Sequence, residues 1–272
     1  MSASRLRRIL IGELSWQRLL RSVVFIYAAV GLYLFFFADG MIFLPPSPSY
    51  QDDGSLIRIP TSGGKTIAAT YLANPGATYT ILYSHGNATD LGLLHPFLLT
   101  LQNEGFAVLA YDYQGYGLSE GRPTERNTYR DIEAAYGYLV NQLKTPPETI
   151  IVMGRSVGGG PSTYLAAQRP VGGLILESTF TKVFRVVVPI KLFPFEKFPN
   201  IDRIRQVQCP VLIIHGTADE TVPFEHSEQL YAAAPSPKQF VPIEGADHNT
   251  VFWSDEATYL GAVQALTDEI SP

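Results

Sequence analysis

The chain has 272 residues, of which 46% are hydrophobic and 17% are charged, and its formal net charge at pH 7 is -5. This length suits one large domain or two small ones with a substantial core. The low charged fraction and the negative net charge exclude a disordered chain and argue against nucleic acid as a partner. The single cysteine, Cys209, excludes an intrachain disulfide.

The N-terminal 44 residues differ in composition from the rest of the chain. Val23 to Leu44 is a run of 22 residues in which Asp39 carries the only charge. Because about 20 apolar residues are enough to cross a bilayer, we predict a membrane anchor at residues 23–44, within a segment 1–44. A buried helix and a cleaved signal peptide are the alternatives. Phe36 and Phe37 disfavour the second, since signal cleavage sites have small residues.

Basic residues precede the apolar run. Five arginines stand there against one acidic residue, Glu13, so this flank has a net charge of +4. The arginines are Arg5, Arg7, Arg8, Arg18 and Arg21. Positively charged flanks stay on the cytoplasmic side of a membrane. We therefore expect a cytoplasmic N-terminus, with the rest of the chain on the outer, periplasmic or luminal, side.

The remainder of the chain alternates apolar runs with helical patterns after a linker rich in Pro, Ser and Asp at residues 45–54. A catalytic domain is expected over residues 55–272. Its predicted strands are 55–59, 66–72, 79–84, 106–112, 149–154, 173–178, 211–216 and 240–244. Its predicted helices are 92–103, 125–143, 157–168, 224–234 and 255–270. The clearest is 125–143, whose apolar residues recur at spacings of three and four.

This alternation predicts an α/β fold with a mostly parallel, doubly wound sheet. Several runs are continuously apolar, which is typical of strands covered by helices on both faces. The first two strands are joined by TSGGK instead of a helix, so they are expected to pair as an antiparallel hairpin. One long irregular connection, at about residues 179–208, is basic and rich in Phe and Pro. We interpret it as a small cap over the C-terminal edge of the sheet.

The stretch Gly154-Arg155-Ser156-Val157-Gly158 has the pattern G-x-S-x-G between a predicted strand and a predicted helix. In a nucleophile elbow, this pattern places the serine on a strained turn, and the glycines avoid collisions with neighbouring segments. The following helix then points its N-terminus at the same place, so the Val157 amide can stabilise an oxyanion. An ordinary glycine-rich turn is the alternative. A phosphate-binding loop is disfavoured because the stretch lacks the lysine of the Walker motif.

A serine nucleophile needs a base and an orienting carboxylate, and on this kind of sheet the order along the chain is serine, acid, histidine. Asp219 comes just after the apolar run VLIIHG, and His248 lies in the loop after the last predicted strand. Both should meet Ser156 at the C-terminal edge of the sheet. Glu220 is the second candidate for the acid. Asp247 is a weaker rival because it is adjacent to the histidine.

The other histidines have structural interpretations. His95, His215 and His226 lie in predicted helices or strands, where most histidines are packed or exposed without catalysing a reaction. His85 belongs to the loop after the third predicted strand.

That loop, Ser84-His85-Gly86-Asn87-Ala88, should supply a second oxyanion donor. The backbone amide of Asn87 is the preferred candidate, and that of Ala88 is the alternative. Asp112 follows the next strand and is expected to shape its own loop by accepting hydrogen bonds from backbone amides. Arg155, beside the serine, is either part of a structural ion pair or a substrate contact.

Several motifs jointly resemble a known family. They are SHGNATDLG, YDYQGYGLSEGRPTE, GRSVGG, PVLIIHGTADETVP and GADHN, between about Ser84 and Asn249. They resemble the α/β-hydrolase superfamily, and within it the abhydrolase-domain branch of membrane-associated protein depalmitoylases and their single-pass relatives. The resemblance implies an α/β-hydrolase fold, a Ser156–Asp219–His248 triad, and no metal or cofactor. The depalmitoylases carry an N-terminal cysteine cluster, whereas this chain has an apolar run in that place.

These observations predict a membrane-anchored serine hydrolase of the carboxylesterase or thioesterase type, acting on an acyl ester or thioester that is lipid-like or near a membrane. Ser156 would attack the acyl carbonyl, His248 would take its proton, and Asp219 would hold the imidazole. The amides of Val157 and Asn87 would bind the oxyanion. The alternatives are a serine peptidase or an acyltransferase on the same fold, and a non-catalytic binding protein. A triad argues against the last, because binding requires no such set.

Overall fold

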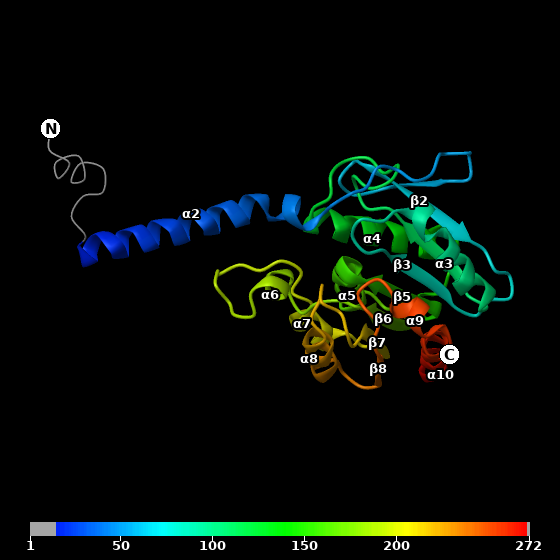
Figure 1. Ribbon diagram of the computed structural model, residues 1–272. Helices are drawn as coiled ribbons and strands as arrows, with labels where there is room; N and C mark the ends of the chain where they lie inside the picture. The colour runs from blue at the N-terminus through cyan, green and yellow to red at the C-terminus, as the bar shows by residue number, and fades with distance from the viewer. Residues whose placement is uncertain (1–14, 271–272) are drawn as a thin grey trace. The chain divides into compact units, whose positions relative to one another are not determined.

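The computed structural model describes residues 15–270 and divides the chain, after Ile42, into an N-terminal helix and a compact body (Figure 1). Helix α2, Trp16–Ile42, begins seven residues before the predicted membrane run and ends two residues before the end of that run. With a rise of about 1.5 Å per residue it is about 40 Å long, and by length and composition it could cross a membrane. Three arginines of the predicted basic flank lie outside the described residues: Arg5, Arg7 and Arg8.

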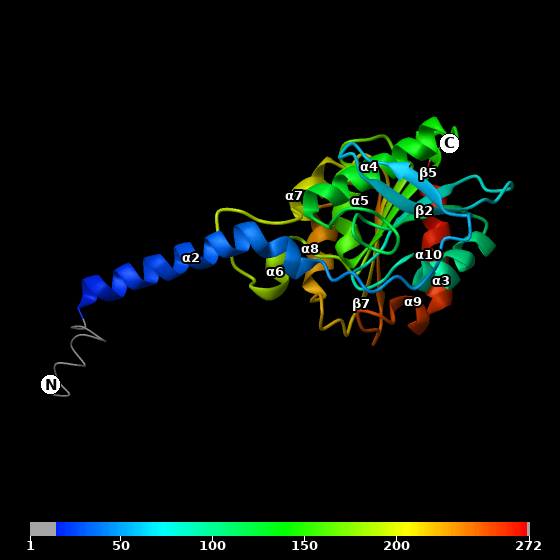
Figure 2. The ribbon, with the colours of Figure 1, turned by 90° about the horizontal axis from the view of Figure 1, so that it is seen from above.

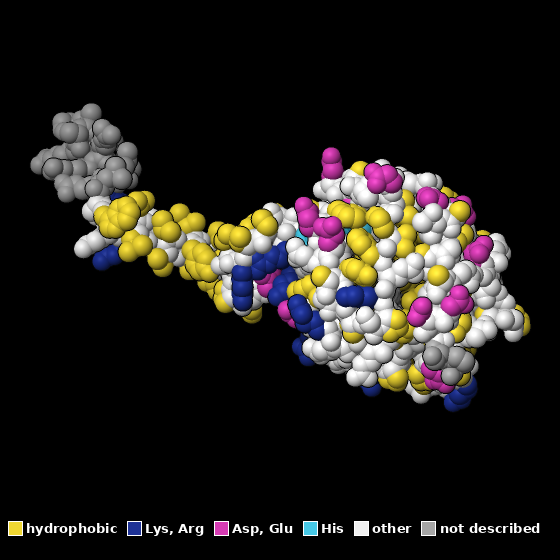
Figure 3. Space-filling view, turned by 90° about the horizontal axis from the view of Figure 1, so that it is seen from below, with side chains coloured by type: hydrophobic (Ala, Val, Ile, Leu, Met, Phe, Trp, Pro, Cys, Tyr) yellow, Lys and Arg dark blue, Asp and Glu magenta, His cyan; other side chains and the backbone are white. Residues whose placement is uncertain are grey.

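The apolar side chains of α2 are exposed along its length. Figure 3 shows hydrophobic side chains over most of this helix. Phe25 is 73% exposed and Phe36 is 69% exposed. The helix is therefore apolar on every side instead of along one face.

A single mixed sheet forms the centre of the body. Its strands stand in the order β1-β2-β4-β3-β5-β6-β7-β8. β1 pairs antiparallel with β2, which confirms the predicted hairpin, and β2 pairs antiparallel with β4. The other pairs are parallel, as expected for a doubly wound sheet. The strands are β1 (Ile57–Pro60), β2 (Thr66–Leu72), β3 (Thr80–Ser84), β4 (Ala107–Tyr111), β5 (Ile150–Arg155), β6 (Gly173–Glu177), β7 (Val211–Gly216) and β8 (Lys238–Ile243).

Helices cover both faces of this sheet (Figure 2). One face carries α4 (Glu125–Asn141), α5 (Gly159–Ala166) and α8 (Glu225–Ala233), and the other carries α3 (Leu91–Asn103) and α10 (Glu256–Glu269). Strands β3, β4, β6 and β7 are buried at every residue. This burial explains why their sequences are largely apolar instead of alternating.

The connection between β6 and β7, the predicted cap, contains short helices that the sequence did not reveal. They are α6 (Val183–Val187) and α7 (Asn200–Arg203), followed by the 3-10 turn η3 (Ile204–Gln206). Each is too short to show a helical period. Phe198 fastens this insertion to the body, because a Cβ on Gly160 of α5 would lie 2.2 Å from its ring. Three further short elements were not predicted: η1 (Pro147–Thr149), η2 (Ser156–Gly158) and α9 (Val251–Ser254).

The segment that leads into the sheet is held against the body. The predicted linker 45–54 has no helix or strand. Just before it, Phe43 is 3% exposed, and its ring packs on Phe198 with 6.1 Å between centroids. Further along, the Ser49 amide donates a 2.7 Å hydrogen bond to Asp90. Residues 43–54 therefore belong to the body, although they form no helix or strand.

Candidate active site

Ser156 lies where β5 turns into the helical segment that continues as α5. Its φ is +52°, the strained conformation predicted for a nucleophile elbow. A Cβ on Gly154 would lie 2.4 Å from the Gly158 carbonyl oxygen, and a Cβ on Gly158 would lie 2.1 Å from the Ser84 carbonyl oxygen. Larger residues at these two positions would collide with backbone, which confirms the role predicted for the glycines. The Thr179 hydroxyl donates a 2.7 Å hydrogen bond to the Ser156 carbonyl oxygen and holds the turn.

Three predicted side chains form one hydrogen-bonded line. His248 Nε2 is 3.0 Å from Ser156 Oγ, and His248 Nδ1 is 2.7 Å from Asp219 Oδ2. Asp219 follows β7 and His248 follows β8, so both stand at the strand ends where β5 delivers the serine. An ionised carboxylate only accepts, so in the neutral imidazole Nδ1 carries the proton and Nε2 can accept one from the serine. These distances suit a base that assists attack by the serine oxygen.

Asp219 is also held by groups that the sequence did not identify. Its Oδ1 accepts hydrogen bonds from the Thr221 and Val222 amides, at 2.9 and 2.8 Å. His215 is fully buried, and its Nε2 lies 3.1 Å from Asp219 Oδ2 and 2.9 Å from the Val222 carbonyl oxygen. Both neighbours are acceptors, so this nitrogen carries a proton. His215 is buried, as its structural interpretation expects, but it also supports the Asp219 carboxylate. The spacing of four residues between the two is the one feature of the sequence that indicates this contact.

These contacts keep the Asp219 carboxylate ionised. Burial by itself raises the pKa of a carboxyl group. Here the hydrogen bonds from His215, His248 and the Val222 amide outweigh it, and they lower the pKa of Asp219 well below its usual value. A permanent negative charge therefore faces the imidazole and can stabilise the imidazolium that forms when the serine proton is taken up.

The rival candidates have other contacts. Asp247 accepts a 2.7 Å hydrogen bond from the Asn249 amide and shapes the turn behind the histidine. Glu220 is exposed, as is His95 on α3. His226 Nδ1 contacts the base of the insertion, 3.2 Å from a backbone amide there. The structural interpretations of His95 and His226 agree with these surroundings.

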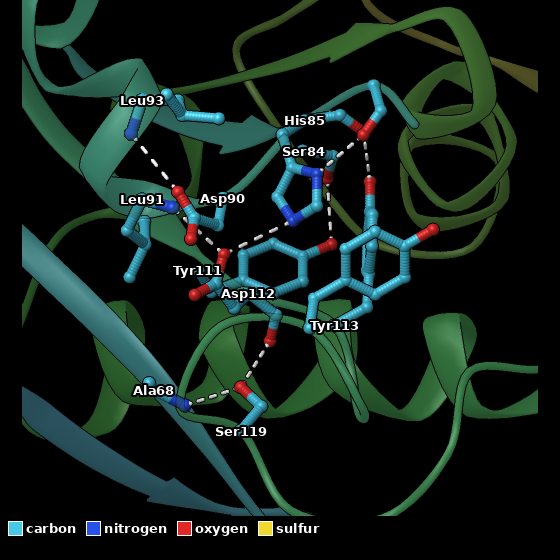
Figure 4. A network of polar contacts seen from close by, with 12 residues as sticks. Ala68, Ser84, His85, Asp90, Leu91, Leu93, Tyr111, Asp112, Tyr113 and Ser119 are labelled. Atoms are coloured by element: carbon cyan, nitrogen blue, oxygen red, sulfur yellow. Dashed lines mark hydrogen bonds and ion pairs between the residues drawn. The ribbon is translucent and has the colours of Figure 1, made fainter. Parts of the chain in front are cut away.

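The loop after β3 is held in place by the hydroxyl of a buried tyrosine, Tyr113 (Figure 4). The Tyr113 hydroxyl donates a 2.6 Å hydrogen bond to the His85 carbonyl oxygen. The His85 ring turns back on the loop, with Nδ1 2.7 Å from the Gly86 carbonyl oxygen. A Cβ on Gly86 would lie 3.6 Å from the Ser156 Cβ. The backbone of this loop is therefore close enough to the nucleophile to supply an oxyanion donor.

Asp112 braces the same region, as Figure 4 shows. Its Oδ1 accepts a 3.0 Å hydrogen bond from the Leu91 amide at the start of α3. Its backbone oxygen accepts from the Ser119 hydroxyl at 2.8 Å, and Ser119 in turn accepts from the Ala68 amide of β2. Asp90 caps α3 by accepting from the amide of its first turn. The prediction for Asp112 is therefore wrong for its side chain, which binds Leu91 outside its own loop, and only its backbone oxygen helps to shape that loop.

The two candidate loop donors differ in conformation. The Asn87 side-chain oxygen accepts hydrogen bonds from the Leu44 amide at 2.8 Å and from the Tyr116 hydroxyl at 2.5 Å. Asn87 therefore ties the loop to the segment that leads into the body. Ala88 has a positive φ of +53°. The assignment of the oxyanion donors to the amides of Val157 and Asn87 stays a prediction.

Arg155 connects the elbow to the loop that carries the histidine. Its Nη2 donates hydrogen bonds to the His248 carbonyl oxygen at 2.9 Å and to Asn249 Oδ1 at 3.1 Å. Its Nε forms an ion pair with Glu177 at the end of β6, 3.0 Å from Oε1, and the Tyr259 hydroxyl donates to Oε2 at 2.7 Å. The structural ion pair is confirmed. The contact with a backbone 93 residues away has no signal in the sequence.

A cavity of about 190 Å³ opens beside Arg155. Apolar side chains from α3 and α9 line it, among them Leu94, Phe97 and Phe252. No residue of the insertion 179–208 is among its described lining residues, so the predicted cap does not cover this cavity.

Comparison with known proteins finds relatives over most of the chain. The family model described as serine aminopeptidase, S33, matches residues 76–198. Alpha/beta hydrolase domain-containing protein 17B of Homo sapiens is 44% identical over 195 residues, which cover 70% of this chain and 68% of the relative. Alpha/beta hydrolase domain-containing protein aho-3 of Caenorhabditis elegans is 34% identical over 259 residues, which cover 84% of this chain and 76% of the relative.

Solved structures resemble this one at lower identity. An esterase from Pyrococcus furiosus has a TM-score of 0.70 at 16% identity, covering 83% of this chain and 98% of that one. The esterase domain of a Rhodothermus marinus protein has a TM-score of 0.60 at 23% identity, covering 77% and 95%. At these identities the likeness concerns the fold.

Replacing Arg155 by Met should lower both stability and activity. The change leaves the Glu177 carboxylate buried without its ion pair, at a cost of about 3 kcal/mol, and frees the loop of His248. In the double variant Arg155→Met/Glu177→Gln the buried charge is gone, so the free energy of unfolding should largely recover. The kcat/KM for an acyl ester should stay about tenfold below the wild type, because the bond to the loop is still missing.

Denaturant unfolding and ester hydrolysis, measured on both variants, test this separation. Activity that recovers together with stability in the double variant would show that Arg155 acts only through its ion pair.

Asp219 should stabilise the fold in a pH-dependent way. Because its pKa is lowered in the folded chain, its ionised form contributes stability above the ordinary carboxyl pKa of about 4, and the contribution is lost as the pH falls through the folded value. Asp219→Asn should therefore lower the free energy of unfolding at about pH 6, and the difference from the wild type should shrink at about pH 3. Urea unfolding at the two pH values measures it. An equal difference at both would contradict a stabilising charge.

Proposed function

Because this chain belongs to the α/β-hydrolase family that includes alpha/beta hydrolase domain-containing protein 17B, we propose that it is a membrane-anchored hydrolase of acyl esters or thioesters. The chain has the α/β-hydrolase fold and is a serine hydrolase. The proposal goes beyond these statements and concerns the catalytic residues, the acyl-enzyme, the substrate class and the anchor. The observation that carries it is the line from Ser156 Oγ through the His248 ring to Asp219, with hydrogen bonds of 3.0 and 2.7 Å.

In this mechanism Ser156 Oγ forms a bond to the acyl carbonyl carbon while His248 Nε2 takes its proton. The carbonyl electron pair moves onto the oxygen, where the amides of Val157 and Asn87 stabilise the charge. The oxyanion collapses and the bond to the leaving alcohol or thiol breaks, with His248 returning the proton to it. A water activated by His248 then attacks the acyl-enzyme, and the carboxylic acid and free serine are released. Asp219 stabilises the imidazolium in both halves of the cycle.

The cavity beside Arg155, whose described lining includes none of Ser156, Asp219 and His248, suits an acyl group better than a peptide N-terminus. The matching family model is described as serine aminopeptidase, so peptide cleavage is the second candidate. An aminopeptidase must receive a free ammonium group, usually with a carboxylate. In the described lining of the cavity the one carboxylate is Glu177. Its oxygens already face Arg155 and the Tyr259 hydroxyl. The apolar walls from α3 and α9 suit an acyl chain.

The anchor is supported by α2 and by the charges before it. Helix α2 has the length and composition of a membrane span. The arginine-rich flank supports an orientation with the N-terminus in the cytoplasm and the body on the outer, periplasmic or luminal, side. A substrate carried by or near the membrane fits this arrangement.

A fluorophosphonate probe should label the folded wild type and not Ser156→Ala. Ser162→Ala is a matched control, because Ser162 is a buried serine on α5 outside the hydrogen-bonded line, and it should keep the label. A portion of the same wild-type preparation kept free of the probe should hydrolyse p-nitrophenyl esters faster than aminoacyl anilides. Labelling that persists in Ser156→Ala would contradict the assignment of Ser156 as the nucleophile. Faster cleavage of the anilides than of the esters would indicate a peptidase instead.

The orientation predicts where a tag on the C-terminus will be found. In intact cells or sealed vesicles with the native orientation, an impermeant reagent should reach the tag from the outer side. An N-terminal tag should react only after the membrane is permeabilised. The reverse pattern would overturn the proposed orientation and would leave the hydrolase chemistry untouched.

A further inference from the structure

Residues 43–50, which we call the entry segment, belong to the body and contact the loop that follows β3. At the start of this segment, the Leu44 amide donates a 2.8 Å hydrogen bond to Asn87 Oδ1. The ring of Phe43 is 3% exposed and packs on the ring of Tyr116, with 6.4 Å between the centroids. The entry segment therefore reaches the loop that is expected to supply the second oxyanion donor.

Three donors converge on the side-chain oxygen of Asn87. Besides the Leu44 amide, the Tyr116 hydroxyl donates to this oxygen at 2.5 Å and the Ala88 amide donates at 3.1 Å. A carbonyl oxygen has two lone pairs, so its capacity to accept is fully used. The donors come from the entry segment, from the segment after β4 and from the loop itself. Together they fix the Asn87 side chain and the backbone that carries it.

The same oxygen bears on the choice between the two candidate loop donors. Ala88 has a φ of +53°, a conformation that costs free energy for a residue with a Cβ. The bond from its amide to Asn87 Oδ1 fixes the direction of the peptide group before this strained residue. Because that bond occupies the Ala88 amide, it argues against Ala88 as the oxyanion donor and favours the backbone amide of Asn87.

A second pair of contacts holds the far end of the loop. The Ser49 amide donates a 2.7 Å hydrogen bond to Asp90, the residue that caps α3. The Tyr50 hydroxyl donates to the buried carboxylate of Asp112, which also accepts from the amide at the start of α3 at 3.0 Å. Glycine leaves the space for this approach, since a Cβ on Gly92 would lie 2.4 Å from Ser49 Oγ. The entry segment thus holds the loop at its middle and at its end.

The loop held in this way lies against the nucleophile elbow. A Cβ on Gly86 would lie 3.6 Å from the Ser156 Cβ, and a Cβ on Gly158 would lie 2.7 Å from the His85 carbonyl oxygen. An oxyanion donor is effective when it lies about 2.7–3.1 Å from the oxygen that becomes charged. A small displacement of the loop backbone would therefore weaken the donor, while the line from the serine through the histidine to the aspartate stays in place.

We propose that the entry segment is a positioning element of the active site. Its Leu44 amide, together with the Tyr116 hydroxyl, positions the Asn87 side chain and thereby the loop amide that stabilises the oxyanion. This inference rests on the hydrolase mechanism of the proposed function. Because these groups act through the loop backbone, their loss should slow the step in which charge develops and leave substrate binding nearly unchanged.

Tyr116→Phe tests this role in the full-length protein, because it removes the hydroxyl and keeps the ring that packs on Phe43. The kcat for a p-nitrophenyl ester should fall about tenfold, with KM within about twofold of the wild type, since a misaligned donor loses transition-state stabilisation. The pH dependence of kcat/KM should be unchanged, since it reports the base, His248. Asn87→Ala removes the acceptor for all three donors and should lower kcat at least as much.

Tyr136→Phe is the matched control. The Tyr136 hydroxyl donates a 2.9 Å hydrogen bond to the carbonyl oxygen of Pro170, which precedes β6 and so lies at the opposite edge of the sheet from the elbow. Its loss should lower the midpoint of denaturant unfolding about as much as Tyr116→Phe and leave kcat at the wild-type value. Equal loss of kcat in the two variants, or a wild-type kcat in folded Asn87→Ala, would overturn the inference.

A pair of proline substitutions tests the entry segment itself. Leu44→Pro removes the amide that bonds to Asn87, whereas Ser47→Pro removes an amide that donates to no residue the structure describes. Leu44 and Ser47 are both exposed and both precede a proline, so the two changes restrict the chain alike. Only Leu44→Pro should lower kcat, by about tenfold. Equal kcat in the two variants would contradict the role of the Leu44 amide, and Tyr116→Phe decides the question if Leu44→Pro fails to fold.

Exchanging the carbonyl oxygen of the substrate for sulfur probes the oxyanion directly. Sulfur is a weak acceptor, so the wild type should hydrolyse an ester faster than the matching thionoester, and this ratio should fall together with kcat in Tyr116→Phe and Asn87→Ala. A lower kcat with an unchanged ratio would overturn the inference alone. Wild-type protein that neither takes a fluorophosphonate label at Ser156 nor cleaves the ester would overturn the proposed function.

Discussion

The site depends on the strained turn at Ser156. Its backbone lies so close to neighbouring segments that positions 154 and 158 have no room for a side chain. The positive φ turns the hydroxyl out at the strand end. Glycine at 158 lets the turn pass within contact distance of the Ser84 carbonyl, and glycine at 154 leaves room for the Gly158 carbonyl. The same closeness brings the loop after β3, held by the Tyr113 hydroxyl, beside the serine. One steric constraint therefore sets both the nucleophile and the position of the loop expected to stabilise the oxyanion.

His248 is held at its ring by Asp219 and at its backbone by Arg155, and each of these two buried charges has a partner. Its ring faces Asp219, whose negative charge is kept by His215 and by two backbone amides. Its backbone is bound by Arg155, whose guanidinium is paired with Glu177. Unpaired charges at such depth would be costly. Because β5, β6, β7 and β8 are consecutive in the sheet, their ends place these groups side by side.

The same edge that gathers polar chemistry also gathers exposed apolar surface. Strand interiors are covered on both faces, so the ends of strands are where side chains remain free to vary. In this chain the loops there carry both the hydrogen-bonded line and large exposed side chains such as Trp253 and Val187.

The sequence by itself determined the eight strands, the hairpin at the start and the elbow, because buried parallel strands are continuously apolar and G-x-S-x-G needs two glycines. It also placed Ser156, Asp219 and His248 in one order at strand ends. Helices of four or five residues gave no period and were missed. Only the tertiary structure decided that Arg155 binds the His248 backbone and that His215 supports Asp219. The Arg155 contact depends on which strands are neighbours, and a pattern read along one chain carries no record of distances across a sheet. The His215 contact depends on how the chain turns after β7, which brings residues four apart face to face.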